Sequence, residues 1–156
     1  MSKKKNVLII GTGTIGEPLI GLLADFKSKL GIDVYFHKRT PLMDEIAKVN
    51  SLTTRGANLV VDPDKEKAFQ QLGHQPVSVY EAALKLCDVI IDCTPAGNLA
   101  KKEHYLPAAL KKGTKKVFIA QGSEKGFGIP YAYGINDIVL DSNPDFIQVV
   151  SCNTHN

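Results

Sequence analysis

Three glycines near the start of the chain have the spacing of a phosphate-binding turn. Gly11, Gly13 and Gly16 directly follow the apolar run at residues 7–10 and match the pattern G-x-G-x-x-G. In this pattern the first glycine permits a tight turn, the second lets the backbone approach a pyrophosphate, and the third packs a helix against the strand. Free backbone N–H groups and the positive dipole at that helix start favour an anion. We therefore expect a dinucleotide here, the alternative being an ordinary strand-to-helix turn.

A basic pair at the end of the next expected strand indicates which dinucleotide is bound. The strand at residues 33–37 is followed by Lys38, Arg39 and Thr40. In proteins that bind NAD an Asp or Glu at this point hydrogen-bonds the ribose 2'-hydroxyl, and none is present at this strand end. Two cations and a hydroxyl at a helix start suit a 2'-phosphate instead. The sequence predicts that NADP binds at least as well as NAD, unless Lys38 and Arg39 are simply solvated surface charges.

A cysteine near the last residue is the second candidate for chemistry. Cys152 follows residues 146–151, which are expected to form the last strand. A residue just past a parallel strand lies at the carboxyl edge of the sheet, where ligands of such folds bind. If a helix begins at Asn153, its positive end lowers the thiol pKa and favours the reactive thiolate. On spacing alone, a buried and inert cysteine is an equal alternative.

These residues can meet only if strands and helices alternate along the chain. Apolar periodicity, caps and glycine stops predict helices at residues 16–30, 40–55, 63–72, 78–86 and 99–110. Thr40 with Pro41 predicts one helix start, and Ser78 with Glu81 predicts another as a capping box. Strands are expected at residues 7–10, 33–37, 58–61, 88–93, 116–120 and 146–151, with a looser stretch at 121–144. The alternation predicts an α/β fold, a Rossmann-type doubly wound parallel sheet with helices on both faces.

The composition limits the class of protein. A chain of 156 residues, 44% hydrophobic and 22% charged, can bury one core but has little room for a second domain. Its net charge of +3 does not require a nucleic-acid or membrane partner. The lysines at 3–5 precede only four apolar residues, too few for a signal peptide or membrane anchor. Three cysteines without a C-x-x-C motif indicate free thiols and a cytoplasmic location, and no metal site is expected.

Taken together, the motifs resemble those of the archaeal-type (class II) glyceraldehyde-3-phosphate dehydrogenases over essentially the whole chain. G-T-I-G at 13–16 is similar to the family's cofactor turn, and Lys38-Arg39-Thr40 falls where the family has a Lys-Thr pair. Q-G-S-E-K at 121–125 is similar to its Q-G-G-E-K, and V-V-S-C-N-T at 149–154 resembles its catalytic-cysteine motif. The departures are Ile10, Ser123 and His155, where the family usually has Asn, Gly and Thr.

The resemblance implies roles for individual residues. Cys152 is implied to be the catalytic nucleophile, and Ser151 and Asn153 are implied to contact substrate. Thr14, Ile15 and Gly122 are implied to contact the cofactor, NADP or NAD. The implied reaction oxidises an aldehyde phosphate through a cysteine thioester, passes hydride to the cofactor and uses inorganic phosphate to release the product.

The family carries a further catalytic domain after the cysteine, which supplies the general base. We therefore expect residues 1–150 to be an NAD(P)-binding domain and residues 151–156 to be the start of a catalytic domain that is otherwise absent. This chain alone is expected to be inactive, and its full-length parent to be a homo-oligomer. Two alternatives stay open. One is an aspartate-semialdehyde or acetylglutamyl-phosphate semialdehyde dehydrogenase, which the motifs fit less well; the other is an NADP sensor without catalysis.

Overall fold

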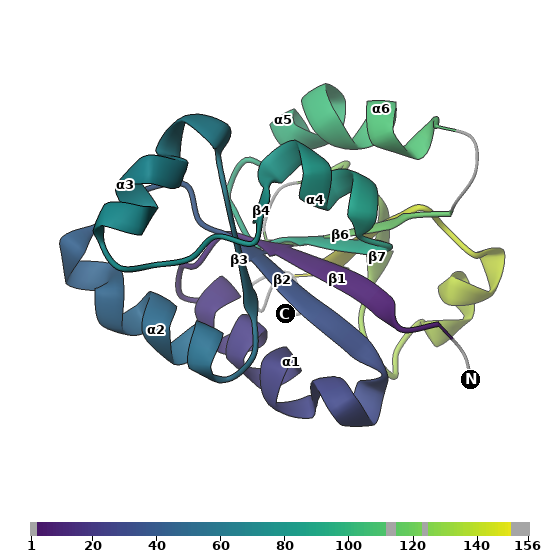
Figure 1. Ribbon diagram of the computed structural model, residues 1–156. Coiled ribbons are helices and arrows are strands. Elements are labelled where there is room, and N and C mark those ends of the chain that lie inside the picture. The colour runs from purple at the N-terminus through teal and green to yellow at the C-terminus, as the bar shows by residue number, and fades with distance from the viewer. Residues whose placement is uncertain (1–2, 112–114, 123–124, 151–156) are drawn as a thin grey trace.

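The computed structural model describes residues 3–111, 115–122 and 125–150, and its centre is an eight-stranded sheet (Figure 1). The strand order is β4-β3-β2-β1-β5-β6-β8-β7, and every pairing is parallel. The strands are β1 Lys5–Ile10, β2 Ile32–His37, β3 Asn58–Val61, β4 Ser78–Val79, β5 Val89–Asp92, β6 Val117–Gly122, β7 Ile129–Tyr131 and β8 Phe146–Val150. The predicted fold class, a doubly wound parallel sheet, is confirmed.

Helices cover both faces of the sheet. The α-helices are α1 Gly16–Leu30, α2 Ile46–Thr54, α3 Glu66–Gln71, α4 Tyr80–Leu86, α5 Gly97–Ala100 and α6 Leu106–Ala109. Figure 1 shows α1 and α2 on one side of the strands and α4, α5 and α6 on the other. Between α5 and α6 the chain is a π-helix at Lys101–Tyr105, and 3-10 turns lie at Met43–Glu45, Pro63–Lys65 and Asp137–Ser142.

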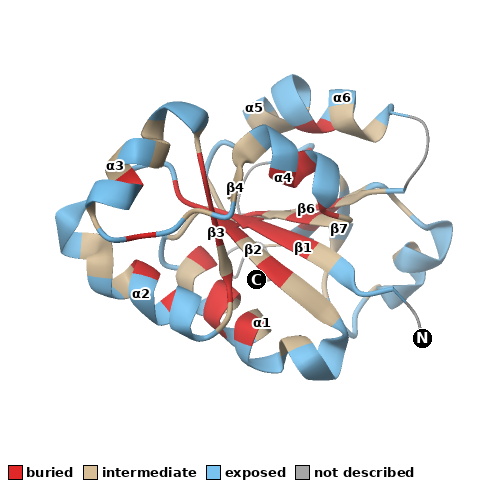
Figure 2. Ribbon diagram, in the orientation of Figure 1, coloured by how far each residue is buried: buried red, intermediate tan, exposed pale blue. Residues whose placement is uncertain are grey.

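Strand β1 is buried on both faces because helices pack on each side of it (Figure 2). Val7 and Ile9 belong to the apolar cluster under α1 and α2. Leu8 and Ile10 point the other way, into the cluster that includes Tyr105. This strand therefore reads as a continuous apolar run, which is why the sequence pattern identified it.

The chain reverses its direction of winding on either side of β1. Strand β1 pairs with β2 on one edge and with β5 on the other, so Ile10 lies opposite both His37 and Asp92. In open parallel sheets, the crevice at the carboxyl ends of two strands that wind in opposite directions is the usual ligand-binding place. The ends of β1, β2 and β5 are therefore where a site is expected.

Two predicted helix starts are wrong. Thr40 does not cap a helix, because residues 40–42 continue without helical structure and Leu42 is extended with φ −106° and ψ 132°. The chain instead stays extended through Leu42, and the first turn begins only at Met43. Ser78 does not form a capping box either: it pairs with Val60 in β4, and α4 begins at Tyr80 without a side-chain cap. Ser78 and Val79 instead pair with Val60 and Val61 of β3.

The stretch predicted to be loose contains one more strand. β7 pairs in parallel with β8 at the edge of the sheet, where the missing N–H of Pro130 is tolerated. The predicted helix at 99–110 is present as three successive helical pieces. Its predicted stop at Gly113 lies outside the described residues, as does Ser151 at the end of the last predicted strand.

Candidate dinucleotide-binding site

Each glycine of the turn has a geometry that fits the role expected of it. Gly11 has a φ of +97°, in the left-handed region that favours glycine. A Cβ on Gly16 would lie 1.9 Å from the Gly11 carbonyl oxygen, so α1 can start here only without a side chain. Among the residues that the structure describes, a Cβ on Gly13 would meet no protein atom within 4 Å, which leaves open space beside the backbone. The turn therefore fits a pyrophosphate that approaches at Gly13.

Two hollows adjoin at the carboxyl edge of the sheet, and the glycine turn contributes to both. The larger, of about 590 Å³, is lined by Gly11 and by the ends of β2 and β5. The smaller, of about 390 Å³, is lined by Gly13, Thr14 and Ile15 together with residues at the ends of β6 and β8. Thr94 and Pro95 line both, so the two hollows lie side by side along the edge. Such volumes suit an extended small molecule.

The cations expected to hold a 2'-phosphate differ in their availability. The Lys38 side chain is only 6% exposed, and its Nζ is ion-paired with Glu45. Arg39 and Thr40 also line the larger hollow. Among the residues that the structure describes, Arg39 forms no ion pair. Arg39 is therefore the uncommitted cation at this end, and Lys38 has a partner seven residues further on that the strand pattern did not reveal.

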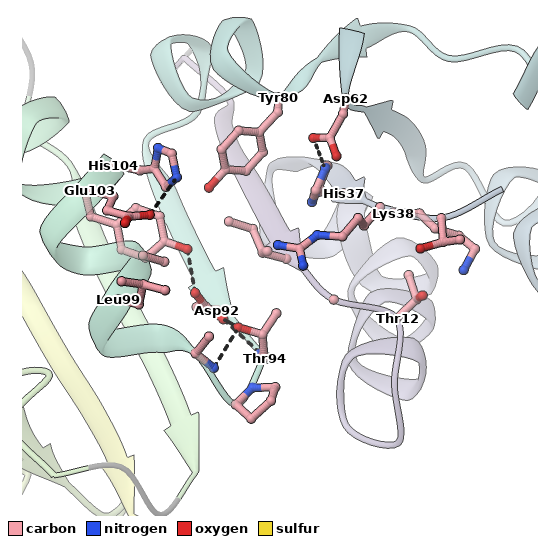
Figure 3. A pocket seen from close by; sticks show the side chains of 18 of the residues that line it. Thr12, His37, Lys38, Asp62, Tyr80, Asp92, Thr94, Leu99, Glu103 and His104 are labelled. Atoms are coloured by element: carbon pink, nitrogen blue, oxygen red, sulfur yellow. Dashed lines mark hydrogen bonds and ion pairs between the residues drawn. The ribbon is translucent and has the colours of Figure 1, made fainter. Parts of the chain in front are cut away.

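The buried carboxylate of Asp92, at the end of β5, lines one wall of the larger hollow (Figure 3). Asp92 is 1% exposed and accepts hydrogen bonds from the Thr94 backbone N–H at 2.8 Å, the Thr94 hydroxyl at 2.7 Å and the Tyr105 hydroxyl at 2.6 Å. Burial and the neighbouring Asp92 raise the pKa of Tyr105, which therefore stays a donor. These bonds hold the turn after β5 against the helix above it, and they define one wall of the crevice.

Aromatic rings line another wall of the same hollow. The Tyr80 ring centre lies 4.7 Å from that of His37 and 5.5 Å from that of His104. Figure 3 shows Tyr80 between the two histidines. The His37 ring nitrogen Nε2 lies 2.9 Å from a carboxylate oxygen of Asp62. Burial lowers the pKa of His37, and the nearby Asp62 partly opposes this effect. A wall of aromatic rings suits the stacking of a planar heterocycle.

The sequence pattern predicts only part of the lining of this hollow. His37 is the last residue of one predicted strand and Asp92 is the second-last of another, so the strand prediction places both near the carboxyl edge. Tyr80 begins α4, and His104 and Tyr105 lie in the π-helix Lys101–Tyr105. No spacing in the sequence indicates that these side chains lie near His37.

The predicted cofactor residues are brought to one edge. Gly11, Lys38, Arg39 and Thr40 line the larger hollow, and Gly13, Thr14 and Ile15 line the smaller one. Gly16 is buried at the start of α1. Gly122 ends β6 and pairs with Val150. The catalytic Cys152 and the substrate contacts Ser151 and Asn153 lie outside the described residues, and their roles stay predictions.

Cys93 also lines the smaller hollow, and it packs against the apolar cluster under α1. Burial raises its pKa to about 11, so it is an unreactive thiol. Within the described residues, no group of three His, Cys, Asp or Glu side chains is placed to hold a metal ion. The helices in this part of the chain are all too short or too polar to cross a membrane.

The parallel sheet, the glycine turn and the crevice beside it define a Rossmann-type dinucleotide-binding domain. No family model matches the chain. Its sequence is 30% identical to the glyceraldehyde-3-phosphate dehydrogenase of Methanobacterium bryantii, covering 96% of this chain and 42% of that enzyme. It is likewise 30% identical to that of Methanothermus fervidus and 31% identical to that of Methanothermobacter thermautotrophicus, with the same coverage of both. The chain is a relative of the archaeal glyceraldehyde-3-phosphate dehydrogenases, and the predicted resemblance to this family is confirmed.

The chain spans about two fifths of the length of these relatives, which is consistent with an N-terminal NAD(P)-binding domain. Among solved structures, 1-deoxy-D-xylulose 5-phosphate reductoisomerase from Zymomonas mobilis in complex with NADPH is similar, with a TM-score of 0.47 and 13% identity over 76% of this chain and 39% of that one. A structural likeness of this degree adds no argument. Sequence relatives and site together support an NAD(P)-binding oxidoreductase domain.

Proposed function

We propose that the chain binds NADP or NAD for a phosphorylating glyceraldehyde-3-phosphate dehydrogenase. The observation that carries this proposal is the glycine turn, where Gly13 leaves open space beside the backbone and two hollows extend away from it. The sequence relatives supply the reaction class. Since the chain covers 42% of those relatives, the activity and its substrates, an aldehyde phosphate and inorganic phosphate, are all part of the proposal.

The hollows suggest how the cofactor lies. Its pyrophosphate is held at Gly13, Thr14 and Ile15, at the N-terminus of the 15-residue helix α1. Its adenosine end enters the larger hollow, where the rings of Tyr80 and His37 offer a stacking wall. The nicotinamide end then reaches the smaller hollow beside the ends of β6 and β8. In this direction the nicotinamide lies beside the end of β8, which precedes Cys152 by two residues in the chain.

The proposed chemistry uses Cys152 as the nucleophile. Its thiolate attacks the aldehyde carbon and retains the acyl group as a thioester until inorganic phosphate releases it as an acyl phosphate. Ser151 and Asn153 hold the substrate beside the thiol. The bound nicotinamide supplies the hydride acceptor for the oxidation.

Calorimetry on the purified chain tests cofactor binding. We expect both NADP and NAD to bind, with NADP at least as tight, and Arg39→Asp to weaken NADP by about tenfold or more, since a charge-assisted hydrogen bond contributes about 1.5–3 kcal/mol. The affinity for NAD should change little. Lys29→Glu is the matched control, because it makes the same change of charge in the last turn of α1, at the opposite edge of the sheet. Equal weakening of both cofactors by Arg39→Asp would refute the 2'-phosphate assignment.

Mass spectrometry after a single turnover tests the chemistry. With the expected full-length parent enzyme, NADP and glyceraldehyde 3-phosphate but without inorganic phosphate, we expect an acyl group on Cys152 and an equal amount of NADPH. The Cys152→Ala variant should form neither. If the wild-type full-length parent binds NADP but forms neither product, the role that remains is an NADP-binding module without catalysis.

A further inference from the structure

The carboxylate of Glu45 lies between two lysines at the end of the crevice that would receive the adenosine ribose. One oxygen is ion-paired with Lys38, and the other accepts a hydrogen bond from Lys48 Nζ at 2.7 Å. These bonds, chiefly the one from Lys38, lower the pKa of Glu45, so the group is a carboxylate at neutral pH. Glu45 also lines the larger hollow, on the same side as Lys38 and Arg39. The residues directly after β2 include no acid, and Glu45 brings a carboxylate to the same hollow from further along the chain.

Lys48 connects this pair to the glycine turn. Its Nζ donates a hydrogen bond to the Thr12 carbonyl oxygen at 3.2 Å and lies 3.4 Å from a carboxylate oxygen of Glu17. Two lysines and two carboxylates thus neutralise one another beside the turn. Their charges cancel, so the local excess of positive charge expected from the sequence is reduced to Arg39.

We propose that Glu45 is a specificity-determining residue for the cofactor, because it holds Lys38 and Lys48 in ion pairs and so reduces the advantage of a 2'-phosphate. The inference rests on the proposed dinucleotide function. A 2'-phosphate is dianionic or nearly so, and it must approach a carboxylate whose lysine partners are already engaged. A 2'-hydroxyl carries no charge and can donate a hydrogen bond to Glu45. Glu45 therefore favours NAD, while Arg39 favours NADP.

A purely structural role for Glu45 predicts something different. Glu45 ends the 3-10 turn Met43–Glu45, and through Lys48 it is connected to Thr12 in the glycine turn. If its bonds only held these turns in place, its loss would weaken NADP and NAD together. A specificity role requires the two affinities to move apart.

The experiment is calorimetry with NADP and NAD on the Glu45→Gln variant. Glutamine has the same size and still accepts a hydrogen bond, but it removes the charge. We expect the NADP dissociation constant to fall by about tenfold or more and the NAD constant to change by less than about threefold. Asp25→Asn is the control, because it neutralises an ion-paired carboxylate at the exposed Arg55 pair. It should leave both constants unchanged.

A second variant tests whether the released lysine causes the gain. Lys38→Met in the Glu45→Gln background keeps the buried side-chain volume, and it should abolish most of the gain in NADP affinity. If Glu45→Gln fails to fold, Glu45→Asp gives the same comparison, because the shorter side chain cannot reach both lysines. A smaller gain in NADP affinity with unchanged NAD affinity is then expected.

The outcomes separate this inference from the function on which it rests. A wild-type chain that binds neither cofactor refutes the dinucleotide function itself. A wild-type chain that binds both, together with folded Glu45 variants whose ratio of NADP to NAD affinity is unchanged, refutes only the role of Glu45.

Discussion

A Cβ atom on Gly16 would lie 1.9 Å from the carbonyl oxygen of Gly11, closer than any real contact allows. The obstacle is backbone, so it cannot move aside as a flexible side chain would. We predict that Gly16→Ala lowers the free energy of unfolding by about 1–3 kcal/mol, because the turn or α1 must shift to make room. Urea denaturation measures this loss.

Gly13→Ala provides the matched comparison, since its added methyl group would meet no atom of the described part of the chain within 4 Å. Its free energy of unfolding should change by no more than about 0.5 kcal/mol. Its dinucleotide affinity should nevertheless fall by tenfold or more, because the methyl group occupies the space proposed for the pyrophosphate. A Gly13→Ala chain that binds cofactor as well as the wild type would place the pyrophosphate elsewhere.

The thiols should differ sharply in reactivity. Cys87 is fully buried, and burial raises its pKa to about 12, while that of Cys93 is raised to about 11. At pH 8 these two are almost entirely in the unreactive thiol form. Limited iodoacetamide treatment followed by mass spectrometry should therefore find the label on Cys152.

The Cys152→Ala variant serves as the control for this labelling. In its native state it should take up almost no label, and after unfolding in urea it should take up two per chain. Preferential labelling of Cys93 in the native wild-type chain would contradict the assignment of Cys152 as the reactive thiol.

The hydrogen bond between Tyr105 and Asp92 should stabilise the fold. The Tyr105→Phe substitution removes a hydroxyl that donates to a buried carboxylate at 2.6 Å, and it leaves that oxygen with one partner fewer. The expected loss is about 1–3 kcal/mol in the free energy of unfolding. Tyr131→Phe removes a similar bond to Asp137 on the surface, at 2.9 Å, and should cost less than about 0.5 kcal/mol. Equal losses of unfolding free energy in both variants would show that the burial of Asp92 does not strengthen its hydrogen bond to Tyr105.

Stability should decline below neutral pH partly because of His37. Its pKa is lowered in the folded chain, chiefly by burial, so the unfolded chain binds more protons just below the ordinary pKa of 6.5. The contribution is present above pH 6.5 and is lost as the pH falls from there toward the folded-state pKa. Urea denaturation at a series of pH values should show a shallower decline for His37→Gln. Some decline should remain, because burial also lowers the pKa of His74. An unchanged slope in the variant would mean that His37 is not the group that titrates.

The sequence predicted those parts of the molecule that depend on residues close together in the chain. The run at residues 7–10 and the three glycines are adjacent in the chain, so their pattern alone indicates a strand, a turn and a helix. The partner of Lys38 could not be inferred in the same way. Whether Glu45 meets it depends on the extended path of residues 40–42 around Pro41, and the predicted helix start at Thr40 would have sent the chain in another direction.

The short strands show a second limit. β4 has two residues and β7 has three, too few for any alternation of apolar and polar side chains to be visible. They form because β3 and β8 offer unpaired edges that their backbones can join. The hydrogen bonds of Asp92, at the end of β5, depend in turn on Tyr105, which lies 13 residues later in a helix. Such contacts follow from the assembled fold and have no signature in local spacing.

The central place of β1 also has a consequence during synthesis of the chain. Its partner on one side is β5, and Asn6 at its start bonds to Asp88, 82 residues later. At the usual speed of translation, on the order of ten seconds separate the emergence of the two strands from the ribosome. During that time the edge of β1 has no β5 to pair with, and an apolar strand with an open edge tends to associate with other chains. The nascent chain therefore passes through an aggregation-prone stage, and the crevice beside the glycine turn forms only once β5 has emerged.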